Sequence, residues 1–195
     1  VNVESTSETR LKFRETLFSA EGMKNYIGGV ILYDETIKQK TSSGKTIPDL
    51  IKSFGSIPGI KVDTGAKKLA GSSEEKITEG LDGLRERLAE YYKLGARFTK
   101  WRAVYNISKK YPSELAVKAN AHALARYAAL VQEAKMVPIV EPEVLMDGEH
   151  NIMKCYEVTS NVLKECYKEL KIHNVNLKGT ILKPNMILPG SKSKD

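Results

Sequence analysis

The sequence predicts an α/β fold built on a parallel sheet. Apolar segments alternate with segments of helical periodicity, and the apolar segments begin roughly 30 to 40 residues apart, which is typical of βα units feeding a parallel sheet. The run Ile27-Gly-Gly-Val-Ile-Leu32 is continuously apolar, as expected for a strand that is covered on both faces. The expected strands are Ile27–Tyr33, Ile57–Asp63, Phe98–Arg102, Val137–Glu141 and Gly179–Lys183.

Helices are predicted between these strands from apolar stripes with a three- or four-residue repeat. An opening helix is expected near Glu8–Ala20, from Leu11, Leu17 and Phe18. Three longer stripes follow: Leu81, Leu84, Leu88 and Tyr91; Val117, Ala121, Leu124, Ala128 and Val131; and Ile152, Cys155, Thr159, Val162, Cys166 and Leu170. Gly95 is a stop signal for the first of these stripes and Pro112 a start signal for the second. Ala70-Gly-Ser-Ser73 is read as a turn, with Ser72 and Glu75 at capping-box spacing before a helix.

Composition is that of an ordinary globular chain. The 195 residues are 41% hydrophobic and 28% charged. No apolar stretch approaches the roughly 18 residues of a transmembrane helix, and the polar start Val1-Asn-Val-Glu4 lacks the apolar core of a signal peptide. We therefore expect a cytoplasmic protein without a membrane partner.

The net charge of +7 favours anionic partners. Nucleic acid is not predicted, because no Lys/Arg-rich block is interleaved with stacking aromatic residues. A phosphorylated small molecule fits the modest basic excess equally well.

Cofactor and metal chemistry find no support in the motifs. Gly28-Gly29 lies within a strand pattern, and no GxGxxG or Walker A motif is present to bind a nucleotide. The histidines His122, His150 and His173 have no metal-ligand spacing, so no metal is expected. The two cysteines, Cys155 and Cys166, share an apolar helical stripe and are expected to be buried, reduced thiols.

Charged pairs accompany several predicted strands. They are Lys61 and Asp63, Lys100 and Arg102, and Glu141 and Glu143. Strand side chains repeat every second residue, so each pair projects on one side of its chain. Ligands of parallel α/β folds bind at the carboxyl ends of the strands. We expect these pairs to lie at those ends and to converge on a charged ligand, with Trp101 facing away and packing against a helix.

Lys183 is the most informative single residue. It ends a short apolar strand and precedes Pro184, which cannot donate to a sheet ladder and favours extended backbone before it. Its amine should reach past the sheet edge. A lysine amine held against apolar surface near other cations becomes a nucleophile that can form a Schiff base with a ketone. Taken alone, such a residue is more often a solvated lysine at a strand end.

The predicted strands and helices, taken in order along nearly the whole chain, resemble segments of the class I fructose-1,6-bisphosphate aldolases. The segments that carry the resemblance are Ile27–Thr36, Gly59–Asp63, Phe98–Arg102, Val137–Glu143 and Leu182–Met186, which resemble strands two to six of that family. Leu81–Leu84 and Ala125–Tyr127 resemble its helix signatures. The resemblance implies a TIM (β/α)8 barrel, of which residues 1–195 form an incomplete portion lacking the first and last strands.

The resemblance also implies a role for each matching residue. Lys183 matches the Schiff-base lysine, Glu141 the carboxylate that handles the C4 hydroxyl proton and assists carbinolamine dehydration, and Lys100 the charged lysine beside the Schiff base. Lys61 and Arg102 match residues that contact the C6-phosphate half of the substrate. Glu143 matches a carboxylate that holds the lysines in place. Without the resemblance, Lys61 and Arg102 are better explained as halves of structural ion pairs, and Glu143 can be purely structural.

The implied activity is cleavage of fructose 1,6-bisphosphate to dihydroxyacetone phosphate and glyceraldehyde 3-phosphate, in glycolysis and gluconeogenesis. It needs no metal or organic cofactor, and family members are usually homotetramers. Preference for the bisphosphate over fructose 1-phosphate stays open, because the loops that decide it are not in the sequence. Family members are nearly twice as long, so the chain is expected to be a fragment that lacks full activity by itself.

Two rival interpretations remain. The chain can be a non-catalytic barrel remnant that binds phosphorylated ligands or protein partners. A basic nucleic-acid binder is the third hypothesis, and it rests on charge alone.

Overall fold

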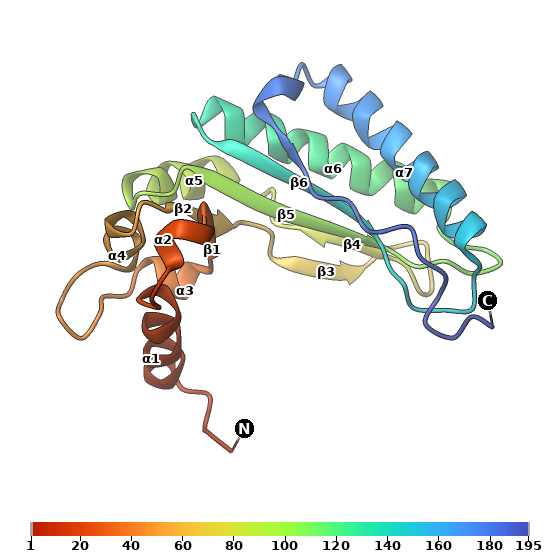
Figure 1. The fold of residues 1–195 in the computed structure, drawn as a ribbon. Helices are drawn as coiled ribbons and strands as arrows, with labels where there is room; N and C mark the ends of the chain where they lie inside the picture. Colours follow the sequence, from red (N-terminus) through yellow and green to blue (C-terminus); the bar gives the residue numbers. More distant parts are fainter. Residues whose placement is uncertain (1, 195) are drawn as a thin grey trace.

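A five-stranded parallel sheet forms the centre of the computed structural model, which describes residues 2–194 (Figure 1). Its strands follow the order β1-β2-β5-β6-β7, and every neighbouring pair is parallel. The strands are β1 (Gly29–Leu32), β2 (Ile57–Lys61), β5 (Phe98–Tyr105), β6 (Val137–Val144) and β7 (Ile181–Leu182). All five expected strands and their parallel arrangement are confirmed.

Helices α5 (Leu84–Lys93), α6 (Glu114–Glu133) and α7 (Ile152–Ile172) correspond to the three long apolar stripes. Figure 1 shows α6 and α7 side by side over one face of the sheet. Their buried residues include the expected stripes, together with both cysteines as free, buried thiols. The exceptions to the expected stripes are Leu81, which precedes α5 and is only partly buried, and Ile152, which is exposed at the start of α7. Burial raises the pKa of Cys166 to about 12, so this thiol stays protonated and inert near neutral pH.

Short helices connect the first strands. They are α2 (Met23–Tyr26), α3 (Asp34–Ile37) and α4 (Ile47–Ser53), with a 3-10 turn at Leu177–Gly179 before β7. These pieces are too short to show an apolar stripe in the sequence. None of the helices within residues 2–194 is long and apolar enough to cross a membrane.

A hairpin, β3 (Gly65–Lys68) and β4 (Lys76–Glu79), is absent from the sequence prediction. The prediction of a helix after Ser72 was therefore wrong, although Ser72 and Glu75 do exchange capping-type hydrogen bonds. The buried Asn120 on α6 holds the hairpin: its Oδ1 accepts from the Thr78 N–H at 3.1 Å and its Nδ2 donates to the Lys76 carbonyl at 2.9 Å. Long-range contacts of this kind leave no periodic pattern in a sequence.

The sheet has two chemically different faces. On β5, Thr99, Trp101, Ala103 and Tyr105 are buried on the side that α6 covers. Trp101 packs on Tyr127 of α6 with ring centroids 5.3 Å apart, which confirms that it turns toward a helix. The intervening residues, Phe98, Lys100 and Arg102, therefore point to the opposite, concave face.

The concave face is apolar where the strands begin. A hollow of about 460 Å³ lies there, and its lining includes Gly29, Ile57, Phe98, Ile139 and Ile181. Gly59 has no room for a side chain, because a Cβ would meet the Phe98 ring at 2.3 Å. Gly29, at the start of β1, likewise has no room for a side chain, because a Cβ there would come within 2.9 Å of the Phe98 ring.

Tyr127 ties the helical layer to two strands. Its side chain is fully buried, its hydroxyl donates to the Ile139 carbonyl at 3.2 Å, and it lies 2.6 Å from the Thr99 hydroxyl. Burial raises the pKa of Tyr127, so the hydroxyl remains a donor.

Replacing this hydroxyl should be costly. We expect Tyr127→Phe to lower the free energy of unfolding by about 1–3 kcal/mol, because buried partners lose a hydrogen bond without gaining water. Urea unfolding followed by circular dichroism measures the change. The exposed Tyr156→Phe is the matched control and should be neutral; an equal effect of both substitutions would contradict the assignment.

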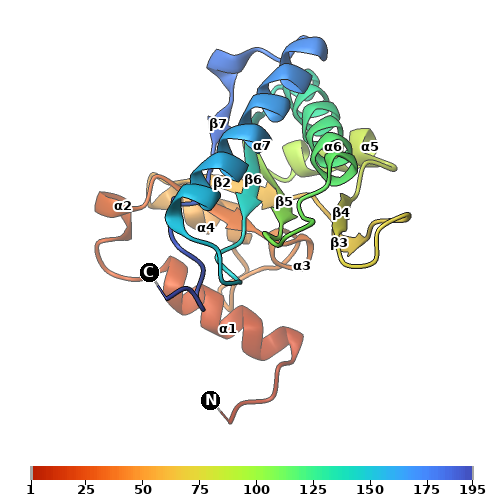
Figure 2. The same ribbon diagram turned by 90° about the vertical axis from the view of Figure 1, so that its right-hand side faces the viewer.

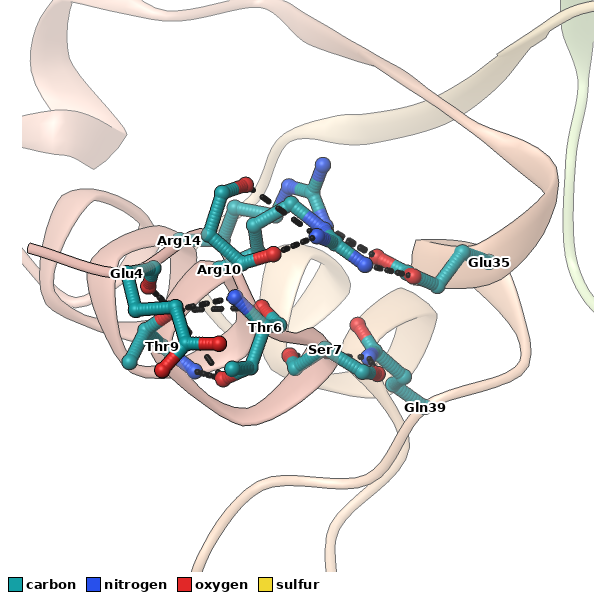
Figure 3. Close-up of polar contacts among 9 residues, drawn as sticks. Glu4, Thr6, Ser7, Thr9, Arg10, Arg14, Glu35 and Gln39 are labelled. Carbon is teal, nitrogen blue, oxygen red and sulfur yellow. Dashed lines mark hydrogen bonds and ion pairs between the residues drawn. The ribbon is translucent and has the colours of Figure 1, made fainter.

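Helix α1 (Ser7–Phe18) lies on the side of the molecule away from α6 and α7 (Figure 2). It matches the expected opening helix, and Leu11 and Phe18 pack against the core. Leu17 is exposed, so the predicted stripe was wrong at that position. The contacts of α1 with α3 are polar (Figure 3). Arg10 donates two hydrogen bonds to the Glu35 carboxylate, at 2.5 and 3.0 Å, and Arg14 donates one at 2.9 Å.

This docking should depend on pH. Hydrogen bonds from Arg10 and then Arg14 lower the pKa of Glu35 from 4.5 to about 2. A carboxyl whose pKa is lowered by folding stabilises the docked state above its unfolded value, and that contribution disappears as the pH falls toward 2. Amides of α1 should exchange hydrogen faster in Glu35→Gln than in the unchanged chain at pH 7. The difference should vanish near pH 2; a difference that does not change with pH would contradict the role of Glu35.

Candidate active site

Glu141 is the centre of the charged cluster on the concave face. It lies in the middle of β6 and is only 3% exposed. Lys183 follows β7 directly, and its N–H donates to the Val140 carbonyl at 2.9 Å, which continues the ladder by one residue. This register places the two side chains together, with the Lys183 Nζ 2.5 Å from Glu141 Oε1.

Lys100 approaches Glu141 from the other side. It projects from β5, and its Nζ lies 2.9 Å from the second carboxylate oxygen, Oε2. A buried carboxylate is costly unless cations neutralise it, and here each oxygen has one. Lys183, Glu141 and Lys100, which the sequence predicted to act together, are thus in direct contact across three adjacent strands.

The two amines differ in access. The Lys183 side chain is 55% exposed, whereas that of Lys100 is 14% exposed. A solute that enters the concave face can therefore reach the Lys183 amine while Lys100 stays against the sheet. The arrangement presents one accessible amine beside one water-poor carboxylate, which suits nucleophilic attack coupled to proton transfer.

Lys61 ends β2 and forms a pair of its own. Its Nζ lies 2.5 Å from Asp63 Oδ1 and also donates to the Asp63 carbonyl at 2.9 Å. Lys61 is in register with Lys100 on the neighbouring strand, so both project on the concave face. The pairing matches the structural alternative considered from the sequence, and an anionic ligand would have to share Lys61 with Asp63.

Arg102 pairs with Glu143, through a hydrogen bond from its Nε. This bond raises the pKa of Arg102, against the opposing effect of partial burial. Glu143 was expected to hold the lysines in place. Within residues 2–194 its ion pair is with Arg102 instead. The residue in register with Glu143 on β5 is Val104, so the pair with Arg102 is diagonal across the two strands, as is the pair of Glu141 with Lys100.

The position of the pairs along the strands also differs from expectation. Lys61 and Lys183 do lie at strand ends, but β5 continues past Arg102 to Tyr105 and β6 continues past Glu141 to Val144. Lys100, Arg102, Glu141 and Glu143 are therefore inside strands. Pro142 itself lies within β6.

Two further residues shape the site: Asp63, which the sequence analysis named only as half of a charged pair, and Asn185, to which it gave no role. Asp63 is 6% exposed and accepts from the Gly65 and Arg102 backbone N–H groups as well as from Lys61. Asn185 anchors the chain after Lys183: its Oδ1 accepts from the Val144 N–H at 3.1 Å and its Nδ2 donates to the Thr159 hydroxyl at 3.1 Å. The signal was present in the sequence, as an amide two residues after Lys183 and a carboxylate two after Lys61.

Comparison with known proteins decides the family. A family model described as "Glycolytic: Fructose-bisphosphate aldolase class-I" matches residues 1–195. The chain belongs to this family. This confirms the resemblance that the strand motifs indicated.

Relatives of the aldolase chain support the same assignment. The chain is 54% identical over 193 residues to cytosolic fructose-bisphosphate aldolase 4 of Arabidopsis thaliana. The match covers 99% of this chain and 49% of the relative. A probable class 1 aldolase of Xanthomonas campestris is 55% identical over 190 residues, covering 97% and 57%. The chain thus spans about half the length of these curated relatives.

A solved aldolase structure has the same fold. The fructose-bisphosphate aldolase of Plasmodium falciparum superposes with a TM-score of 0.97 at 44% identity, over 100% of this chain and 56% of that one. The α/β architecture with its parallel sheet is therefore that of an aldolase.

The charge cluster should be strongly coupled. We expect Glu141→Gln to lower the free energy of unfolding by about 3 kcal/mol, because it leaves the nearly buried Lys100 ammonium without its counter-ion. Lys100→Met in the same chain should restore part of this loss, since it removes the stranded charge. Urea unfolding of both single variants and the double variant measures the coupling; additive effects would contradict a shared ion pair.

Proposed function

We propose that this chain carries the Schiff-base half of a class I fructose-bisphosphate aldolase active site. The observation that supports the proposal most is the contact of Glu141 with both Lys183 and Lys100. The proposed substrate is fructose 1,6-bisphosphate, and the products are dihydroxyacetone phosphate and glyceraldehyde 3-phosphate.

The first stage is formation of the Schiff base. Glu141 is in contact with the Lys183 amine and can accept its proton, which leaves the nitrogen lone pair free to attack the C2 ketone. The carbinolamine then takes a proton from Glu141, loses water and becomes an iminium cation. Because the iminium carries a positive charge at the place of the former ammonium, the carboxylate has a cationic neighbour again once it is ionised.

The second stage is carbon–carbon cleavage. Glu141 removes the C4 hydroxyl proton, the C3–C4 bond breaks, and its electron pair flows into the iminium to give an enamine. Glyceraldehyde 3-phosphate leaves as the aldehyde product. Protonation of the enamine at C3 and addition of water then release dihydroxyacetone phosphate and restore the Lys183 amine.

Lys100 acts in this scheme as a fixed positive charge. Its amine is confined against Glu141 and largely withdrawn from solvent. It pairs with the carboxylate whenever Glu141 is ionised, both in the resting site and after the iminium has formed, so that neither carboxylate oxygen is left as an unpaired buried anion. It also supplies positive charge where the substrate's oxygens develop negative charge.

Lys61 and Arg102 are proposed to contact the C6-phosphate half of the substrate. Both project from the same face as the reactive amine, and the net charge of +7 favours an anionic sugar phosphate. Each is paired to a carboxylate in the structure, Lys61 with Asp63 and Arg102 with Glu143. The phosphate would act by sharing or displacing these partners.

We also infer that residues 1–195 are a portion of a (β/α)8 barrel domain. The half-length match to the relatives supports this inference, as does the apolar hollow on the concave face, which further strands would fill. A cytosolic location is proposed because the Arabidopsis relatives are cytosolic aldolases by name. Assembly of the full-length parent as a homotetramer is proposed from the family resemblance.

Covalent trapping tests the proposal. Incubation of the chain with dihydroxyacetone phosphate and borohydride should produce a single reduced adduct by intact mass, mapped to Lys183 by peptide analysis. Lys183→Met should abolish the adduct, whereas Lys178→Met, which removes a lysine from the adjacent 3-10 turn, should leave it unchanged.

Two results would overturn the assignment. One is a folded chain that forms no adduct under these conditions. The other is an adduct that survives Lys183→Met. Turnover of fructose 1,6-bisphosphate by the 195-residue chain is expected to be far below that of ordinary enzymes.

A further inference from the structure

Two histidines and a glutamate meet on the helical side of the molecule, away from the concave face. His122 projects from α6, Glu169 lies near the end of α7, and His173 caps that helix. Ligand atoms of the three side chains all lie within 4.8 Å of one another. The two imidazole centroids are 4.8 Å apart in an edge-on arrangement.

Sequence spacing could not reveal this cluster. His122 and Glu169 are 47 residues apart and are brought together by the packing of α6 on α7. Only Glu169 and His173 have a helical four-residue spacing, and the sequence analysis considered the histidines alone. From the histidine spacing no metal was expected, and the structure brings His122 and His173 together with Glu169 through the packing of the two helices.

The hydrogen bonds orient the donors. The His173 Nδ1 lies 2.9 Å from the Glu169 backbone carbonyl, which can only accept, so this nitrogen carries the proton and Nε2 keeps its lone pair. A backbone contact of this kind is the usual means by which a ligating histidine is held in one tautomer. Glu169 Oε2 lies 3.0 Å from the His122 Nδ1 and 3.6 Å from the His173 Nδ1.

We propose that His122, Glu169 and His173 bind a divalent transition-metal cation, with Zn²⁺ as the best match. Two imidazoles and one carboxylate are the ligand types that zinc accepts, with water as the fourth ligand of a tetrahedral site. Magnesium and calcium prefer all-oxygen sites and fit poorly.

The three side chains would have to move closer together, because the short Glu169 Oε2 contacts are to the two Nδ1 atoms whereas the free donor of His173 is Nε2. Ligands at zinc–donor distances of about 2.1 Å are separated by about 3.4 Å in a tetrahedron. Glu169 and His173 are 17% and 21% exposed and share a helix end, so they form the fixed part. The His122 side chain is 54% exposed and has room to turn toward them.

A cation at this place would link α6 to α7. Both helices cover the same face of the sheet, and α7 leads through the 3-10 turn into β7 and Lys183. The site is separate from the Glu141 cluster, because the sheet lies between them. The cation would thus stabilise the fold without entering the proposed reaction.

Calorimetric titration of the chain with Zn²⁺ tests the proposal. We expect binding of one equivalent, a rise in the thermal unfolding midpoint with added zinc, and little response to Mg²⁺. His122→Gln and His173→Gln should each weaken zinc binding by about tenfold or more, on the scale of known losses in metal-site variants. His150→Gln is the matched control: it leaves the same number of histidines and should bind zinc normally.

His122 is exposed, so its substitution does not threaten folding, and circular dichroism of each variant checks this. The proposal is overturned if the folded chain binds no zinc. It is equally overturned if His122→Gln and His173→Gln bind zinc as tightly as His150→Gln, which would place the cation elsewhere.

Discussion

The buried carboxylate of Glu141 is the constraint on which the site depends. An anion at 3% exposure is stable only where cations neutralise it, and this sheet supplies two, one for each oxygen. Either lysine alone would leave one carboxylate oxygen without a partner. The two ion pairs also fix where each amine lies, so the Lys183 and Lys100 amines are positioned by their attraction to the Glu141 carboxylate.

The parallel register converts this local requirement into a property of the fold. Arg102 faces Glu141 across β5 and β6, and Val140 faces Leu182 across β6 and β7, which carries Lys183 to the level of the carboxylate. A shift of one residue in either pairing would turn the charged side chains toward α6 and α7. The contacts of Tyr127 with Trp101 and Thr99 on the helical side oppose such a shift, because a shift of one residue would break them as well as the ion pairs.

Much of this could be predicted from the sequence, for physical reasons. Strands buried on both faces and amphipathic helices leave strong local patterns, so the five parallel strands and the long helices were predicted correctly. Alternation along a strand also identified Lys100 and Glu141 as projecting side chains. Lys183 was marked by the proline that follows it.

Other features depend on contacts that no local pattern encodes. The β3–β4 hairpin is held by Asn120 from a distant helix, and Glu143 pairs with Arg102, which lies diagonally across from it on β5. The ends of β5 and β6 were placed too early, at Arg102 and Glu141, whereas the strands run to Tyr105 and Val144. The cluster of His122 with Glu169 and His173 exists only after two helices pack.

The central claim is that Glu141 serves the covalent chemistry of Lys183 while Lys100 balances its charge. A crystal structure of the chain after reaction with dihydroxyacetone phosphate and borohydride tests this most directly. The account predicts a covalent bond from the Lys183 Nζ to C2 of the ligand, with Glu141 in hydrogen-bond contact with the adduct and an unmodified Lys100 still paired to Glu141. An adduct on another lysine, or a Glu141 carboxylate that contacts neither the adduct nor Lys100, would contradict it.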